Sequence, residues 1–174
     1  MHSEEVIPKN EVIKEVQVAM TRLALMHLAY AKTIVEEFGV EKGREVIIKA
    51  IMDYGRKVGE RIKKGFADLP KYGVHEQFEK TLEDAYLVTG CSLAKIFKEY
   101  DELALGSLYC YVDPAKSMAM NPREKLIHKT CEACGDANCT LVVEPTTKED
   151  RQHFEKMDAE LKTINPYLYH KLWD

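Results

Sequence analysis

The sequence predicts an α+β fold in which N-terminal helices pack on a C-terminal antiparallel β-sheet, followed by a C-terminal helix. Apolar residues recur at helical spacing in the first half, strand-like segments bounded by proline turns fill much of the second, and a threonine-capped helical segment follows. The 174 residues contain no repeat or linker-like stretch. We therefore expect one domain over 1–174, with a helical part (10–88), a sheet and metal loop (91–145), and a C-terminal helix and tail (146–174).

Three helices are expected in the N-terminal part. Apolar residues line one face from Asn10 to Phe38, and Gly39 stands where a C-cap glycine would end this helix. A second apolar stripe predicts a helix from about Glu41 to Lys64, which Pro70 closes. A shorter third helix is expected from about His75 to Val88.

The next segments are more apolar and less periodic. Cys91 to Tyr100 fits either a strand or a helix. Leu103 to Val112 contains the run Ser-Leu-Tyr-Cys-Tyr-Val and predicts a strand that ends at Asp113-Pro114.

Two paired strands and a helix are expected at the end of the chain. Glu124 to Thr130 and Thr140 to Glu144 are predicted to pair across a loop that contains three cysteines, and Pro145 ends the second strand. Thr147 then stands at the N-cap of a helix from about Lys148 to Ile164.

Two glycines inside the second predicted helix need a physical reason. Gly55 and Gly59 lie one turn apart on one face, and each costs about 1 kcal/mol relative to alanine in a helix interior. A close helix crossing is the simpler explanation. The alternative is a ligand pocket between these glycines and the predicted strand around Cys110, whose neighbours Tyr109 and Tyr111 would share the opposite strand face.

The cysteine loop is the strongest chemical signal in the chain. Three of the five cysteines lie in the run Cys131-Glu-Ala-Cys134-Gly-Asp-Ala-Asn-Cys139. In a Cys-x-x-Cys-Gly turn two thiolates converge on one ion, and the glycine can take a positive φ to close the loop, as in zinc and iron knuckles. The loop therefore predicts a soft-metal site.

Disulfides and a thioredoxin-type redox pair are the alternatives to a metal. The N-terminal Met1 to Glu5 is acidic where a secretory signal needs a cationic start, so we expect a cytoplasmic protein with reduced thiols. A redox pair would sit between a strand and the helix that it caps, whereas an apolar strand follows this loop. Metal binding is the favoured interpretation.

Charge and hydropathy restrict the partners. The net charge of −4 provides no basic field for nucleic acid. Charged residues or histidines interrupt the apolar windows well before the roughly 20 residues needed to span a bilayer. We expect a small-molecule ligand or substrate, with no nucleic-acid or membrane partner, and a homodimer stays open.

The cysteine loop also carries a family resemblance. The pattern Cys131-x-Ala133-x-Gly135-x-x-x-Cys139, followed by an apolar strand, resembles the C-terminal signature of 4-vinyl reductase-type domains, which bind small molecules. This resemblance implies a zinc site with four ligands: Cys110, His128 in place of the family's glutamate, Cys131 and Cys139.

Spacing alone favours a different fourth ligand. Cys134 completes the knuckle with Cys131, and the closed thiolate set Cys110, Cys131, Cys134 and Cys139 suits zinc, iron or an iron–sulfur cluster. A neutral imidazole is also a good zinc ligand. The choice between Cys134 and His128 stays open at this point.

A second resemblance covers about residues 12 to 144. It rests on six short motifs: Phe38-Gly39-Val40-Glu41-x-Gly43-Arg44, Tyr54-Gly55-x-x-x-Gly59, Cys91-x-Leu93, Leu108-Tyr109-Cys110-x-x-Asp113, Asn121-Pro122 and Gly135-Asp136-x-x-Cys139. Together they resemble the L-2-amino-thiazoline-4-carboxylic acid hydrolase-like family. This resemblance implies a hydrolase in which a metal or a thiolate activates water to attack the C=N or C–S carbon of a small heterocyclic amino acid.

Two function classes follow from these resemblances. In a hydrolase, Asp113 is the candidate base and Cys91 a candidate nucleophile, although Asp113 before Pro114 is most simply a turn residue. The alternative is a non-catalytic small-molecule-binding or sensor domain of the 4-vinyl reductase type with a structural zinc. Four protein ligands would indicate a structural ion, and three plus solvent a catalytic one.

Overall fold

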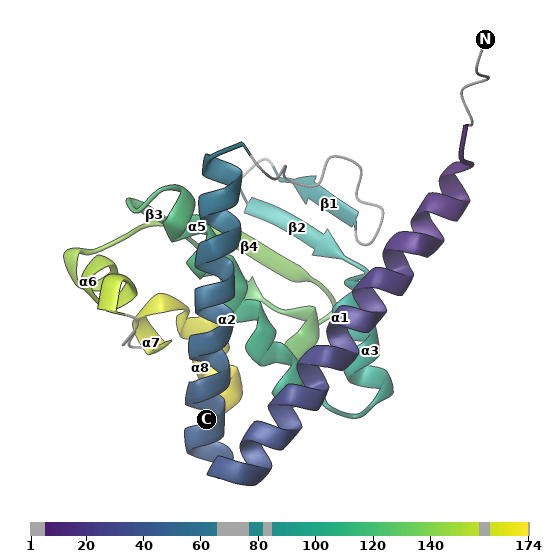
Figure 1. Cartoon of the computed structure of the whole chain (residues 1–174). Coiled ribbons are helices and arrows are strands. Elements are labelled where there is room, and N and C mark those ends of the chain that lie inside the picture. The colour runs from purple at the N-terminus through teal and green to yellow at the C-terminus, as the bar shows by residue number, and fades with distance from the viewer. Residues whose placement is uncertain (1–5, 66–76, 82–84, 157–160, 174) are drawn as a thin grey trace.

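A computed structural model of the protein describes residues 6–65, 77–81, 85–156 and 161–173. Helices pack against a four-stranded antiparallel sheet of order β1-β2-β4-β3, which confirms the α+β fold class (Figure 1). The elements are α1 (Lys9–Phe38), α2 (Val40–Lys63), β1 (Gln77–Lys80), β2 (Ala85–Thr89), α3 (Ser92–Glu99), α4 (Leu103–Gly106), η1 (Ser107–Tyr111), α5 (Val112–Met120), β3 (Glu124–Thr130), η2 (Glu132–Cys134), β4 (Cys139–Pro145), α6 (Lys148–Lys156), α7 (Leu161–Ile164) and α8 (Pro166–Trp173).

The two long N-terminal helices confirm the sequence prediction. Gly39 alone separates α1 from α2, with φ 79° and its amide donating to the Val35 carbonyl at 2.9 Å. A side chain would be strained in this left-handed conformation, so glycine permits the sharp turn. No helix in the described ranges is long and apolar enough to cross a membrane.

The predicted helix over about His75 to Val88 is wrong. Residues 77–80 and 85–89 form the antiparallel strands β1 and β2, in which Phe78 pairs with Val88. Residues 75, 76 and 82–84 of the predicted range lie outside the described part of the chain. Because β2 pairs with β1 on one side and with β4 on the other, hydrogen bonds to distant strands decide its conformation.

The predicted strand over Leu103 to Val112 is also wrong. This segment is helical throughout α4 and η1 and continues directly into α5, and Cys91 to Tyr100 likewise forms helix α3. Leu108 and Tyr111 are fully buried, and a short apolar run can belong to a buried helix as well as to a strand. Pro114 does not end the segment because proline is tolerated in the first turn of a helix.

Helix α5 packs against β3, and α2 covers α5 on its other side (Figure 1). A β-carbon at Gly55 would lie 2.7 Å from the carbonyl oxygen of Val112, and one at Gly59 would lie 2.4 Å from that of Lys116. The glycines therefore serve a close helix crossing, as the simpler interpretation predicted. Helix α5 fills the space directly beside the two glycines, and the ligand pocket expected between them and Cys110 stays a prediction.

We expect Gly59→Ala to lower the free energy of unfolding by about 1–3 kcal/mol, the usual cost of forcing extra atoms into a packed crossing. The added carbon would also lie 2.8 Å from the Ala119 side chain. Chemical denaturation measures the change. Glu60→Ala, at the next and exposed position of α2, is the control. Equal stability of the two variants would contradict the crossing geometry.

The C-terminal segment begins with the predicted cap. The Asp150 amide donates to the Thr147 hydroxyl at 3.0 Å, and the Thr147 amide donates to the Asp150 carboxylate at 2.8 Å. Helix α6 begins at Lys148 as expected and α7 ends at Ile164, while residues 157–160 lie outside the described part. Helix α8, which the sequence did not separate from the tail, packs against β3 and η1.

Candidate metal centre

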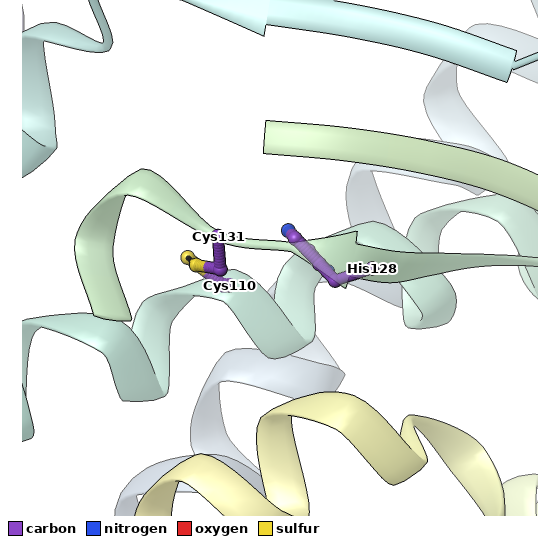
Figure 2. A group of neighbouring side chains, drawn as sticks. All are labelled: Cys110, His128 and Cys131. Atoms are coloured by element: carbon purple, nitrogen blue, oxygen red, sulfur yellow. Dashed lines mark hydrogen bonds between the residues drawn. The ribbon is translucent and has the colours of Figure 1, made fainter. Parts of the chain in front are cut away.

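Three potential ligands converge from separate elements beneath the sheet. Cys110 comes from η1, His128 from β3, and Cys131 from the residue that follows β3 (Figure 2). One ligand atom from each side chain lies within 4.8 Å of the other two, and the Cys131 and His128 residues are 0% and 2% exposed. Cys110 reaches the site although the strand predicted around it is a 3₁₀-helix.

The two thiols have the spacing of metal ligands. Cys110 Sγ lies 3.7 Å from Cys131 Sγ. Two thiolates on one tetrahedral zinc, with Zn–S bonds of about 2.3 Å, lie roughly 3.8 Å apart. None of the five cysteines, all within the described part of the chain, forms a disulfide. The pair therefore fits a shared soft ion.

The other two loop cysteines also lie beside Cys131. Hydrogen bonds with the thiols of Cys110, Cys134 and Cys139 raise the pKa of Cys131, and the bond from Cys131 lowers the pKa of Cys134 and of Cys139. The Cys139 sulfur also accepts the Glu132 amide at 3.2 Å. Three sulfurs thus gather around that of Cys131, and a bound cation would stabilise several of the four as thiolates.

The backbone of the loop supports this convergence. The Cys131 carbonyl accepts the amides of Cys134 at 2.9 Å and of Asp136 at 3.1 Å, so the chain turns back on itself. Gly135 has φ 95°, in the left-handed region. The predicted role of this glycine in closing the turn is confirmed.

Asp136 ties the loop to α8. Its carboxylate accepts hydrogen bonds from the Cys131 amide at 2.7 Å and from the Tyr167 hydroxyl, and pairs with Lys171 Nζ at 3.2 Å. Burial would raise the pKa of Asp136, but these donors together lower it. The sequence did not reveal Tyr167 or Lys171 as partners, since their contact depends on α8 folding back onto the loop.

His128 is held between two side chains. Its Nδ1 lies 3.0 Å from Asn165 Nδ2, and its Nε2 lies 3.7 Å from Asp113 Oδ2. Asp113 also pairs with Lys116 at 3.1 Å. Burial lowers the pKa of His128, partly opposed by the charge of Asp113. Asn165 precedes Pro166, a pattern that signals only a helix boundary in the sequence.

The remaining candidates lie around this centre. Cys91 precedes α3 and is not in the Cys110–His128–Cys131 group; its amide donates to the Glu132 carboxylate at 3.0 Å. Its role as a nucleophile stays a prediction.

Tyr109 and Tyr111 do not share one face, because a 3₁₀-helix turns about 120° per residue. Tyr109 packs edge-on against His27, with ring centroids 5.5 Å apart. Tyr111 is fully buried, and its hydroxyl has no hydrogen-bond partner among the described residues. Burial raises the pKa of Tyr111, and a negative Cys134 raises it further, so this hydroxyl belongs to the polar surroundings of the cysteine loop.

A family model described as L-2-amino-thiazoline-4-carboxylic acid hydrolase matches residues 17–143. The matched range contains the whole cysteine cluster together with Asp113 and His128. No curated protein and no solved structure matches the chain. The 4-vinyl reductase-type interpretation of the cysteine motif stays a prediction.

Proposed function

Because the chain belongs to the L-2-amino-thiazoline-4-carboxylic acid hydrolase family, we propose that it hydrolyses a small heterocyclic amino acid of the thiazoline class. One observation carries the proposal. The family match spans a buried site in which the sulfurs of Cys110 and Cys131 lie 3.7 Å apart, while Asp113 and His128 approach each other beside them. Thiolates can hold a zinc ion, and a carboxylate beside it can act as the base in metal-assisted hydrolysis.

The reaction adds one water to the ring. In a 2-amino-thiazoline the carbon between sulfur and the ring nitrogen carries the C=N bond. The water oxygen bonds to this carbon, the carbon–sulfur bond breaks, and the sulfur leaves with its electron pair. The two protons of water end on the sulfur and on the ring nitrogen. The single ring-opened product carries both a thiol and a urea group, with no oxidation or reduction.

Zinc is the proposed ion, and thiolates from the cysteine cluster would hold it. Cys110 and Cys131 belong to both alternative ligand sets, the one with His128 and the one with Cys134. When bound, zinc polarises an electrophile and lowers the pKa of a coordinated water. Iron is the alternative for a set made of thiolates alone.

The protein's own groups would handle the protons. Asp113 is the proposed acceptor of the proton released by the attacking water, since its carboxylate lies beside His128 at the edge of the cluster. Lys116 Nζ lies 3.1 Å from the other carboxylate oxygen and holds the Asp113 side chain in place beside His128.

A sensor or carrier with a structural zinc is the second candidate. The gathering of the Cys110, Cys134 and Cys139 thiols around Cys131 favours it, because four thiolates would leave zinc no open position for water. In that case a small molecule would bind without being consumed.

Turnover of L-2-amino-thiazoline-4-carboxylic acid by zinc-loaded protein distinguishes the two functions. We expect substrate loss with equimolar thiol product, measured by chromatography and mass spectrometry, and a decrease in kcat of about 10²-fold or more in Asp113→Asn. Asp53→Asn is the control, since Asp53 pairs with Arg56 and Lys57 on the surface of α2. Zinc-loaded protein that leaves the substrate intact while its melting temperature rises with ligand would replace the hydrolase with the sensor.

A further inference from the structure

Both ring nitrogens of His128 have polar neighbours. Nδ1 lies 3.0 Å from Asn165 Nδ2, and Nε2 faces Asp113 Oδ2 at 3.7 Å. A neutral imidazole has one N–H donor and one acceptor nitrogen, so its partners decide which nitrogen carries the proton.

The orientation of the Asn165 amide follows from helix capping. Asn165 immediately precedes Pro166, the first residue of α8, and its Oδ1 accepts the Leu168 amide at 3.3 Å. An asparagine before a proline at the first helical position, bonded to the third helical amide, is an N-cap. Asn165 is 0% exposed, so a rotated amide would set its NH₂ against the Leu168 N–H with little access to water.

The cap therefore directs the Asn165 NH₂ group at His128. Nδ1 must accept this hydrogen bond, and the imidazole proton must sit on Nε2, the nitrogen that faces Asp113. A metal-ligating histidine needs the opposite arrangement, with a lone pair toward the ion and its other N–H toward an oxygen acceptor. In the neutral ring, the lone pair of Nδ1 accepts the Asn165 hydrogen bond and Nε2 carries the proton. Neither nitrogen then has a lone pair available for a metal ion.

We propose, on the basis of the hydrolase site above, that Asn165 is a positioning residue that keeps His128 as a neutral Nε2–H donor. The Nε2–H group of His128 then donates a hydrogen bond to the thiol cluster or to the substrate, and His128 is not a zinc ligand. The ion is held by cysteines, with Cys134 joining Cys110 and Cys131.

The role of α8 supports this assignment. The first turns of this helix contact the site twice: Asn165 bonds to His128, and the Tyr167 hydroxyl bonds to Asp136, which holds the Cys131 amide. The N-terminal end of α8 thus fixes the orientation of the His128 imidazole and the position of the cysteine loop.

The tautomer can be measured directly in ¹⁵N-histidine-labelled, zinc-loaded protein by long-range ¹H–¹⁵N correlation spectra. We expect the Nε2–H pattern for His128 in the parent. Asn165→Asp keeps an oxygen for the Leu168 amide and presents a second oxygen to Nδ1, so it should move the proton to Nδ1. The control Asn121→Asp removes an exposed amide at the end of α5 and should change nothing. An Nδ1–H pattern in the parent would overturn the proposal.

Zinc titration is the second readout. His128→Gln should bind zinc within about threefold of the parent, whereas adding His128→Gln to Asn165→Asp should lower affinity by tenfold or more, because the imidazole then offers a lone pair at Nε2. A tenfold loss in His128→Gln alone would overturn the proposal. Failure of turnover with the Nε2–H pattern intact would remove the hydrolase function and leave the assignment of His128 standing.

Discussion

Cys131→Ser is expected to abolish zinc binding and to lower the free energy of unfolding by several kcal/mol. Cys131 is fully buried, and its sulfur contacts Cys110 at 3.7 Å as well as the thiols of Cys134 and Cys139. A serine would leave the remaining sulfurs without the ligand at their centre, and binding energy lost from such a loop is folding energy. Metal analysis and thermal unfolding with and without a chelator measure the two effects.

Cys91→Ser is the matched control for this experiment. Cys91 is half-buried and lies outside the group formed by Cys110, His128 and Cys131, so its replacement should leave the zinc content unchanged and the melting temperature nearly so. A chelator should lower the melting temperature of the parent and of Cys91→Ser, and should have little further effect on Cys131→Ser. Parent-like zinc content in Cys131→Ser would contradict the site.

The parts of the fold that the sequence predicted are those fixed by local physics. The helices α1 and α2 follow from 3.6-residue periodicity, and the turn between them follows from Gly39. The β3 and β4 strands follow from apolar segments bounded by a cysteine loop and Pro145, and α6 follows from its cap at Thr147.

The two wrong elements were decided by distant contacts. Residues 85–89 carry a pattern that also fits a helix, but β4 supplies a hydrogen-bonding edge that no local window contains. In 103–112 nearly every apolar side chain turns inward, so the periodicity that marks an amphipathic helix is lost.

The cysteine loop was predictable because its ligands lie within a few residues, whereas the positioning residues come from elsewhere in the chain. Asn165, Tyr167 and Lys171 reach the site only after α8 packs against β3. Each of them is more than thirty positions from its own partner, which is His128 for Asn165 and Asp136 for Tyr167 and Lys171. An asparagine before a proline signals a helix start but does not indicate which side chain it will contact.

Asp150→Asn is expected to lower the free energy of unfolding by about 3–5 kcal/mol, the cost of leaving a buried charge without its partner. The side chains of Lys125 and Asp150 are 8% and 1% exposed, with Nζ and Oδ2 3.1 Å apart. Lys125 also donates to the Thr163 carbonyl at 2.6 Å, which joins β3 to the end of α7. Asparagine keeps an oxygen that can accept the Thr147 amide, so the decrease in the free energy of unfolding comes mainly from the broken ion pair. Glu144→Gln, which breaks the exposed Lys129–Glu144 pair, should cost less than about 1 kcal/mol.

The same ion pair predicts a pH dependence. Burial would raise the pKa of Asp150, but the Thr147 amide and Lys125 lower it below the ordinary value. Because the folded-state pKa lies under the unfolded-state value of about 3.9, the carboxylate stabilises the fold fully above that pH and progressively less as the pH falls through the folded-state pKa. The stability difference between parent and Asp150→Asn should therefore shrink under acid.

The double variant Lys125→Met/Asp150→Leu removes both charges and should recover much of the lost stability, since apolar groups of similar volume replace buried ion pairs well. A constant difference between parent and Asp150→Asn from neutral pH into acid, or a double variant no more stable than Asp150→Asn, would show that the ion pair is not what the substitution disrupts.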